Sequence, residues 1–233
     1  MAQLVCGLMA WPQTAEELVQ VQHALATAGL PPWEPTGGVE IGGCFVCFER
    51  GPAGPGRAGD RGWAGAALLS GAVAVAEGRA GAAYEAGLLA LREGRLLEEA
   101  VRRLPRLPDV LLVNATGRDH PRRAGLALHL GAVLGVPTVG VTHRPLLGVG
   151  DWPDDESAAR TPLTLEGEVV GAWLRTRRRA RPVAVHAAWR TDAETALAVV
   201  EASLRNKRTP EPLRLARTVA RIARVAGDPT LRR

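Results

Sequence analysis

Two short apolar segments on either side of a helix-like stretch constrain this chain more than any other feature. Asp109–Val113 and Val136–Val141 are runs of apolar residues typical of buried strands. Between them, residues 120–134 have a helical composition, and Pro121 suits the first turn of a helix, where its missing N–H costs nothing. Earlier in the chain, a meander of short strands is expected at 41–48, 63–69 and 71–77. This order predicts an α/β fold with a mixed central sheet flanked by helices.

The other elements follow from local signals. Thr14 and Glu17 have the spacing of a capping box, and the helix that they begin is expected to end at Gly29. Further helices are expected over 84–104, from about Asp192, and over 211–226, with a hairpin within 162–176 and a strand at 183–187. Because the 233 residues contain no recognisable repeat or linker, we expect a single domain, 1–233.

Basic residues gather in two places of a chain whose net charge is +5. One is the segment Arg175–Arg181. In the last helix, at 100° per residue, an arginine stripe lies nearly opposite an apolar stripe: Arg214, Arg217, Arg221 and Arg224 against Leu215, Val219, Ile222 and Ala226. Solvated arginines above a core-facing stripe explain this pattern, and so do arginines that contact phosphates. Nucleic acid is therefore a candidate partner.

Composition also bears on the compartment. No apolar run reaches the roughly 18 residues that a membrane span needs, so we expect no membrane association. The first residues carry no basic region of the kind that opens a signal peptide. Three cysteines, Cys6, Cys44 and Cys47, are too few for a disulfide framework, and the last two are expected in the core. We expect a cytoplasmic protein, and a monomer in the absence of any oligomerisation signal.

One segment carries a specific resemblance. Residues 108–127 run Pro-Asp-Val-Leu-Leu-Val-Asn-Ala-Thr-Gly-Arg-Asp-His-Pro-Arg-Arg-Ala-Gly-Leu-Ala. This resembles the signature of the endonuclease V family, in which a strand ends in Asp-Gly-x-Gly and His-Pro-Arg-Arg-x-Gly-x-Ala follows. Tyr84–Glu93 is similar to the family's Tyr-(Ile/Val)-Pro-Gly-x-Leu-x-Phe-Arg-Glu, and Arg208–Pro212 to its Arg-Leu-Pro-Glu-Pro. The order and spacing hold over about residues 11–226.

The resemblance implies a ribonuclease H-like fold and an activity. The family hydrolyses a phosphodiester near deoxyinosine in DNA or inosine in RNA, a DNA-repair reaction that uses Mg²⁺. Its four acidic metal positions would fall on Phe45, Glu93, Asn114 and Glu194. A phenyl ring cannot bind Mg²⁺, and an amide oxygen brings no negative charge. Glu93 and Glu194 would thus be the remaining metal ligands.

The same comparison suggests further catalytic positions and leaves alternatives. With Glu93, Glu194 and Asn114, the expected catalytic set includes His120 of the signature and His143, which stands where the family has Lys. Glu194 could instead complete a capping box with Thr191, and Glu93 could be a solvated helix residue. Asp119 could substitute as a ligand or face solvent near a helix N-terminus. His120 could cap a helix or contact phosphate.

The recognition positions differ less from the family pattern. A flipped base would enter a pocket lined largely by backbone, at positions that match Tyr84, Gly87, Leu89, Gly125 and Leu126. The expected contacts to the nucleic-acid backbone are Arg122, Arg123, Arg190, Arg217 and Arg221. Glu85 and Trp189 depart from the family, in the segment that follows Tyr84 and in the family's Gly-His-Arg motif.

We therefore expect an endonuclease V-like protein that binds nucleic acid and has lost most or all phosphodiesterase activity. One alternative is a working Mg²⁺-dependent endonuclease that acts at deoxyinosine or inosine, with Asp119 as a substitute ligand. A second is a non-catalytic scaffold that binds another partner.

Overall fold

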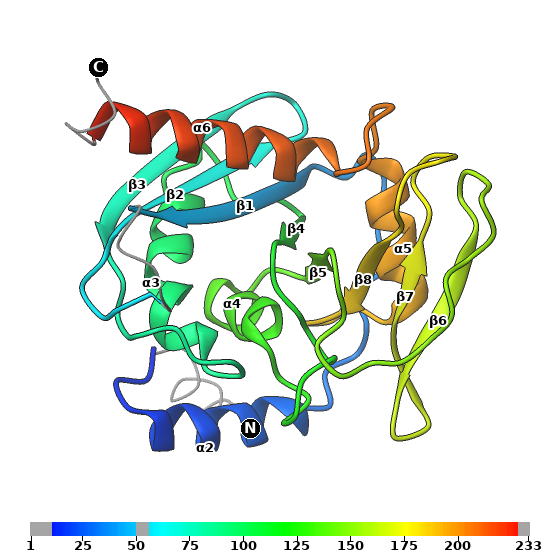
Figure 1. Cartoon of the computed structure of the whole chain (residues 1–233), viewed down its shortest axis with the longest axis horizontal. Coiled ribbons are helices and arrows are strands. Elements are labelled where there is room, and N and C mark those ends of the chain that lie inside the picture. Colours follow the sequence, from blue (N-terminus) through cyan, green and yellow to red (C-terminus); the bar gives the residue numbers. More distant parts are fainter. Residues whose placement is uncertain (1–10, 50–55, 228–233) are drawn as a thin grey trace.

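The computed structural model describes residues 11–49 and 56–227, and an eight-stranded sheet forms its centre (Figure 1). The strands are β1 Ile41–Phe48, β2 Arg61–Leu68, β3 Val73–Arg79, β4 Val110–Val113, β5 Thr138–Thr142, β6 Arg160–Leu165, β7 Glu168–Leu174 and β8 Val183–Ala187. Their order is β3-β2-β1-β4-β5-β8-β7-β6. β4 pairs in parallel with β1 and β5, whereas the other pairs are antiparallel. The predicted mixed sheet is confirmed.

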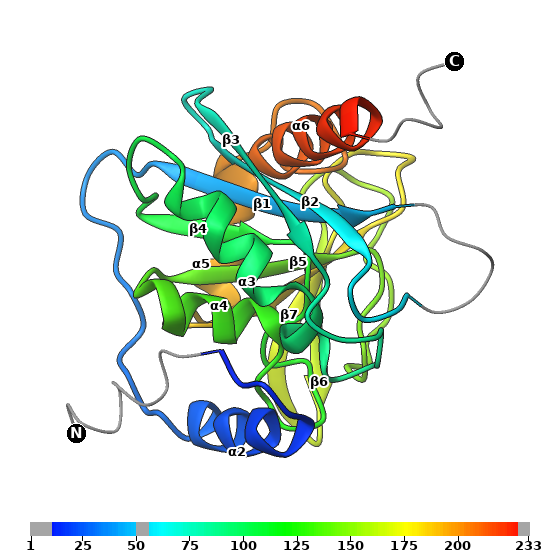
Figure 2. The same cartoon turned by 90° about the vertical axis from the view of Figure 1, so that its left-hand side faces the viewer.

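Helices cover both faces of this sheet. They are α2 Ala15–Ala26, α3 Leu89–Arg102, α4 Leu126–Leu134, α5 Ala193–Ala202 and α6 Glu211–Gly227. α3 and α4 share one apolar core with the sheet, and α2 packs outside them, whereas α5 and α6 lie on the opposite face (Figures 1 and 2). Within the described part of the chain, no helix is long and apolar enough to cross a membrane.

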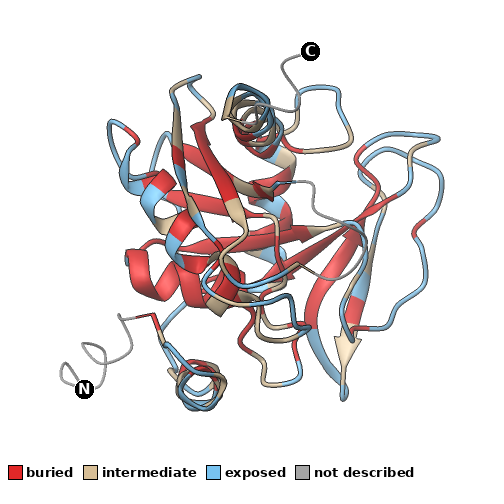
Figure 3. Cartoon of the chain, turned by 60° about the vertical axis from the view of Figure 1, so that its left-hand side comes forward, coloured by how far each residue is buried: buried red, intermediate tan, exposed pale blue. Residues whose placement is uncertain are grey.

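β4 explains why the apolar run at 109–113 is so informative. Leu111 and Val113 belong to the core beneath α3 and α4, and Val110 and Leu112 belong to the core beneath α5. A central parallel strand is buried on both faces, so all of its residues are apolar. All four residues of β4 are buried, and Figure 3 shows the middle of the sheet coloured as buried.

The inward face of α6 differs from the predicted stripe. Its buried residues are Pro212, Leu213, Ala216 and Ala220. Ile222 is 62% exposed. The reason is close packing: a Cβ added at Gly65 of β2 would lie 2.2 Å from the carbonyl oxygen of Ala216. Only small residues allow a helix to approach a strand so closely, so alanines rather than the larger apolar residues face the sheet.

Two helices begin later than predicted. α3 begins at Leu89 instead of 84, after Gly87, whose φ of +82° is incompatible with a right-handed helix. α4 begins at Leu126 instead of 120. Before it, Arg123 has a φ of +54°, and the segment from Asp119 to Arg123 forms bends and a turn. Pro121 therefore lies outside the helix.

Two other predicted local features are confirmed, and one helix cap differs. Thr14 caps α2 by accepting a hydrogen bond from the backbone N–H of Glu17, as the capping box predicts. The β6–β7 hairpin turns at Glu166 and Gly167, whose φ values of +53° and +85° suit a two-residue turn. α5, however, is capped by Asp192 and not by Thr191. The Thr191 hydroxyl instead donates to the carbonyl of Thr138 at 2.7 Å.

Candidate functional site

A cavity of about 180 Å³ opens between α2, the segment before α3, the end of β4 and the start of α4. We call it the Gly87 cavity. Its lining consists of Gln22, Tyr84, Ala86, Gly87, Leu89, Ala90, Asn114, Ala115, Thr116, His120, Leu126, Thr142 and Leu146. Four of the five predicted base-recognition residues lie here. The fifth, Gly125, is the N-cap of α4 and directly precedes the lining residue Leu126. A Cβ added at Gly125 would lie 2.4 Å from the Thr116 carbonyl oxygen.

Three donors converge on the carbonyl oxygen of Gly87. They are Nε2 of Gln22 at 3.1 Å, Nε2 of His120 at 3.1 Å and a guanidinium nitrogen of Arg122 at 3.0 Å. The Arg122 Nε also donates to the Gln22 side-chain oxygen. This network fixes the backbone at a positive φ that glycine adopts most easily. Gln22 was not predicted, although its position four residues after Leu18 on the inward side of α2 is the available signal.

His120 is locked in one protonation state. Its Nδ1 accepts the backbone N–H of Arg122 at 3.2 Å, so its Nε2 carries the proton that is donated to Gly87. Burial lowers the pKa of His120 to about 4 and outweighs the bond to Gly87. His120 is therefore a neutral part of the cavity wall. It caps no helix, since α4 starts at Leu126.

The loop that closes one side of this cavity is held by a buried carboxylate. Asp119 is fully buried and accepts three backbone N–H groups, from Leu146 at 2.6 Å, Leu147 at 2.8 Å and Gly148 at 2.7 Å. The expectation that Asp119 faces solvent is thus wrong. Both of its oxygens are occupied by these donors, so it is also a poor candidate for a substitute metal ligand.

A buried histidine lies behind this carboxylate. His186 Nδ1 is 3.5 Å from Asp119, and its Nε2 is 2.8 Å from the Thr142 hydroxyl, which itself donates to the carbonyl of Arg144. Burial lowers the pKa of His186, and the Asp119 carboxylate opposes this shift. No local pattern indicates this contact, because its members come from separate segments.

A second cavity, of about 150 Å³, adjoins the first; we call it the Glu93 cavity. Its lining consists of Cys44, Phe45, Val46, Tyr84, Leu89, Glu93, Leu97 and Asn114. Three of the four expected metal positions therefore meet here, as the resemblance implies. Among the described residues, no side chain donates a hydrogen bond to Glu93. Burial raises the pKa of Glu93 to about 7, against a smaller opposite effect of Arg92.

Asn114 makes a contact that a carboxylate could not make. Its Nδ2 donates to the carbonyl oxygen of Val141 on the neighbouring strand β5 at 3.0 Å. An ionised aspartate at this position would place a negative oxygen against that carbonyl. The amide is thus adapted to its surroundings.

Phe45 lies beneath two cations. The guanidinium carbons of Arg217 and Arg221 on α6 are 5.1 Å and 5.9 Å from the centre of its ring. These distances are within the range of cation–π attraction. On this side of the sheet, an aromatic ring and two arginines surround the position where the resemblance implies an acid.

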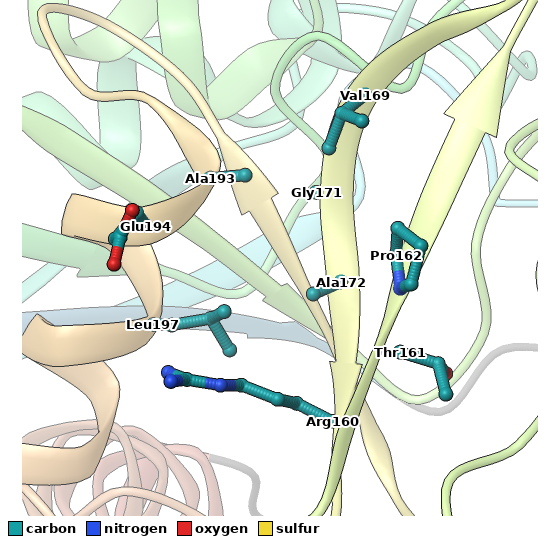
Figure 4. A pocket seen from close by; sticks show the side chains of 9 residues that line it. All are labelled: Arg160, Thr161, Pro162, Val169, Gly171, Ala172, Ala193, Glu194 and Leu197. Carbon is teal, nitrogen blue, oxygen red and sulfur yellow. The ribbon is translucent and has the colours of Figure 1, made fainter.

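Glu194 lies apart from both cavities. It stands on α5, on the opposite face of the sheet from α3, and lines a groove of about 290 Å³ with Arg160 and Leu197 (Figure 4). This separation does not support one metal site shared by Glu93 and Glu194, and their role as ligands stays a prediction. In the part of the chain that the structure describes, no three His, Cys, Asp or Glu side chains come together in an arrangement that can hold a metal ion.

The predicted phosphate-contacting arginines fall into two groups. Arg122 is engaged around Gly87, and Arg123 binds the Leu165 carbonyl and forms ion pairs with Glu166 and Glu168. Arg190 lies near the carbonyl of Pro31. These three guanidinium groups serve contacts within the protein, so their role toward phosphate stays a prediction.

The other two arginines lie near further positive charge. Arg217 and Arg221 form no ion pair with any described acid. The charges of Arg208 and Arg217, after burial, lower the pKa of the exposed His143, which places this residue at the same surface. Of the predicted basic segment, Arg175 is buried and binds three carbonyl oxygens, whereas Arg177, Arg178, Arg179 and Arg181 are exposed.

Comparison with known proteins fits this geometry. A model of the endonuclease V family matches residues 66–218. Endonuclease V of Methanopyrus kandleri is 45% identical over 122 residues, or 52% of this chain and 53% of that protein. The chain spans about half the length of the curated relatives that it matches.

Solved structures match over more of the chain. Endonuclease V of Streptomyces avermitilis is 32% identical, with a TM-score of 0.83 over 94% of this chain and 96% of its own. The Ciona intestinalis endonuclease V, solved with a 24mer DNA containing an inosine followed by a ribo-adenosine, is 19% identical and shares the fold, with a TM-score of 0.75 over 91% of this chain and 98% of its own. The mixed sheet with helices on both faces is the ribonuclease H-like arrangement of these proteins. Because the family model covers more than half of its residues, this chain belongs to the endonuclease V family.

Proposed function

We propose that this protein binds nucleic acid by taking an unpaired base into the Gly87 cavity, and that it has little or no phosphodiesterase activity. Asn114 lines both cavities, and the difference between these two cavities carries the proposal. On one side lies a cavity with a fixed backbone, and on the other lies a metal position with Phe45 and Asn114 in place of acids. Inosine, as deoxyinosine in DNA or inosine in RNA, is the base class that family membership suggests.

The Gly87 cavity supports the first half of the proposal. Enzymes that act on a single base extrude it from the helix and read it in a close pocket. Here the wall at Gly87 is fixed by three side-chain donors, and the part of the lining at Leu146 is fixed by Asp119. Tyr84 is 53% exposed at the cavity and can stack on a neighbouring base.

The Glu93 cavity supports the second part of the proposal, the lack of phosphodiesterase activity. Mg²⁺ prefers carboxylate oxygens, and Glu93 is the single carboxylate in the lining. Its pKa of about 7 means that even this group is partly protonated at neutral pH. The family reaction depends on Mg²⁺, and the donor set here does not fit that ion.

The alternative of an active enzyme that uses Glu93, Glu194 and Asp119 has less support. Glu194 stands on the other face of the sheet, and Asp119 already accepts three N–H groups. A scaffold that binds a different partner is favoured by no specific contact. A combined measurement of binding and cleavage distinguishes both alternatives from the proposal.

The experiment combines binding and cleavage. Oligonucleotides of DNA and RNA, each with one inosine or with adenosine at the same place, are titrated by fluorescence anisotropy and incubated with Mg²⁺ or Mn²⁺. We expect tighter binding of the inosine strand and nicking near background. Rapid site-specific nicking would establish the active enzyme, and absence of binding to every strand would favour the scaffold.

A pair of glycine variants makes this test specific. In Gly87→Ala, the new Cβ lies 3.4 Å from an Arg122 nitrogen and 3.6 Å from Nε2 of His120. Gly59 has nearly the same φ, +80° against +82°, but nothing lies within 4 Å of an added Cβ. Both variants carry a similar backbone cost of about 1 kcal/mol. Only Gly87→Ala is expected to abolish the preference for inosine.

A further inference from the structure

The arginines at Phe45 form a cluster of positive charge without internal compensation. Nε of Arg217 is buried and has no hydrogen-bond partner among the described residues. Neither Arg217 nor Arg221 forms an ion pair within the described part of the chain, because Glu211, the acid of α6, pairs with Arg214. Buried donors are almost always satisfied in folded proteins. Because Nε of Arg224 on the same helix also lacks a partner within the described ranges, the unpaired charges of Arg217 and Arg221 carry the argument for a partner from outside more than this single nitrogen does.

Further cations crowd the same place. After burial, Arg221 and Arg208 lower the pKa of Arg217, and Arg208 and Arg217 lower the pKa of His143. The Arg208 guanidinium group is held near Arg217, because it donates hydrogen bonds to the carbonyl oxygens of Arg181 and Pro182 at 2.7 Å and 2.9 Å. Repulsion among fixed cations costs folding free energy, and a bound anion offsets that cost.

The position of the cluster indicates which anion. Phe45 lies under Arg217 and Arg221 and also lines the Glu93 cavity with Asn114. Asn114 in turn lines the Gly87 cavity. A nucleotide whose base occupies the Gly87 cavity would therefore have a backbone phosphate within reach of Phe45.

We propose that Arg217 and Arg221, held on the Phe45 ring, form a phosphate-binding site that needs no metal ion. The ligand is a phosphodiester group next to the bound base, so the inference rests on the proposed function and refines it. A guanidinium group presents a planar fork that matches two phosphate oxygens. The ring keeps both groups near one place by cation–π attraction, which reduces the entropy lost when phosphate binds.

The first test measures salt dependence without metal. Binding of a single-stranded DNA with one deoxyinosine is titrated over a series of NaCl concentrations, once in EDTA and once in Mg²⁺. We expect affinities that agree within about twofold once salt is matched, because no metal takes part. Arg217→Gln and Arg221→Gln are each expected to lower the slope of log K against log[salt] by about one.

Matched variants separate charge from packing. Arg95 is exposed on α3, so Arg95→Gln removes the same charge elsewhere and is expected to leave the slope unchanged. Phe45→Leu removes the ring and keeps both charges. We expect an unchanged slope and an affinity lowered about two- to fivefold, the value of one cation–π contact. Melting curves verify that each variant is folded.

The second test places the phosphate. A neutral methylphosphonate linkage replaces the phosphodiester on one side of the deoxyinosine and then on the other. On one side, the loss should match that of Arg217→Gln, and combining the two should add little further, as for two partners of one contact. Free inorganic phosphate at matched ionic strength should compete only weakly, whereas strong competition would identify a site for free anions and overturn the assignment to the nucleic-acid backbone.

Other outcomes also separate the two proposals. Strict dependence of binding on Mg²⁺, or unchanged slopes in both arginine variants, would overturn the phosphate site. If the slopes fall as expected but inosine and adenosine strands bind equally, the phosphate site stands and the base cavity fails. If inosine is preferred but the arginine variants behave as wild type, the base cavity stands and the phosphate site fails.

Discussion

The Gly87 cavity and the Glu93 cavity share Tyr84, Leu89 and Asn114, yet they are built on different principles. The first is shaped by backbone, with its one fixed carbonyl held by three donors. The second depends on the identity of a few side chains, and two of those are Phe45 and Asn114. The backbone wall depends on the few side chains that hold it, which here are Gln22, His120 and Arg122. A metal site fails when individual carboxylates are replaced.

The largest expected effect tests whether the Glu93 cavity can be rebuilt. In Phe45→Asp with Asn114→Asp, the new carboxylate at position 45 would pair with Arg217, so we expect a gain in nicking below about fivefold. Adding Arg217→Gln should free that carboxylate and raise Mg²⁺-dependent nicking by at least about 100-fold, or roughly 3 kcal/mol in transition-state stabilisation. A nicking assay and the Mg²⁺-induced change in melting temperature measure this.

The triple variant also carries its own control. A folded triple variant with neither nicking nor stabilisation by Mg²⁺ would show that the loss extends beyond these three positions. Losing the half-buried Phe45 ring should destabilise the fold by about 1–3 kcal/mol, less than for a fully buried phenylalanine. Bound Mg²⁺ should return part of this, because it binds only the folded state.

The next effect concerns the wall of the Gly87 cavity. In Asp119→Asn, one oxygen remains to accept the N–H groups of the 146–148 loop, and an NH₂ group faces at least one of them. We expect the free energy of unfolding to fall by about 2 kcal/mol and the preference for inosine to weaken. Urea denaturation and the binding assay measure the two effects. Asp151→Asn is the control, since that side chain is exposed. Equal effects of the two variants would show that the Asp119 carboxylate does not hold the 146–148 loop.

A smaller effect tests the remaining acid of the Glu93 cavity. Burial raises the pKa of Glu93 to about 7, so the folded protein holds a proton that the unfolded chain releases from about pH 4.5 upward. The stability of the wild type should therefore decline between pH 5 and pH 8 relative to Glu93→Gln, by about 1–2 kcal/mol. Urea denaturation at both pH values measures the difference. Glu85→Gln, an exposed carboxylate, should follow the wild type, and a parallel pH profile for Glu93→Gln would contradict the raised pKa.

The smallest effect is expected at Arg123. This residue already pairs with Glu166 and Glu168 on the β6–β7 hairpin. Arg123→Gln should change the salt slope of nucleic-acid binding by less than about 0.3, against about one for Arg217→Gln. A change as large as that of Arg217 would show that Arg123 leaves its ion pairs to contact phosphate.

Strong local patterns predicted the sheet, and tertiary contacts decided most of what was missed. β1 was predicted at its observed bounds, and β4 within one residue, because strands buried on both sides have continuous apolar sequence. The inward face of α6 differs from the predicted stripe because its first turn packs on Gly43 and Ala216 packs on Gly65, and these close approaches leave no room for larger residues. α4 was extended too far because turns with a positive φ at Arg123 interrupt a helical composition.

The candidate site was predictable where a motif specified it. Glu93, Asn114 and Phe45 come together as the resemblance implied, and so do four of the five base-pocket positions. Glu194 lines neither cavity, and the sequence comparison could not show this because it gives no information about which face of a sheet a helix covers. The roles of Asp119 and Gln22 depend on contacts with distant segments, which no local pattern contains.

The outer edge of β6 has a consequence for how copies of this protein meet. Val149 forms two backbone hydrogen bonds of 2.9 Å with Thr164, the strand carries an irregularity between Leu163 and Thr164, and Pro162 offers no N–H. Strand edges with free backbone groups recruit other chains and seed aggregation. Here the edge is partly occupied and bent, so sheet-to-sheet aggregation through β6 is disfavoured.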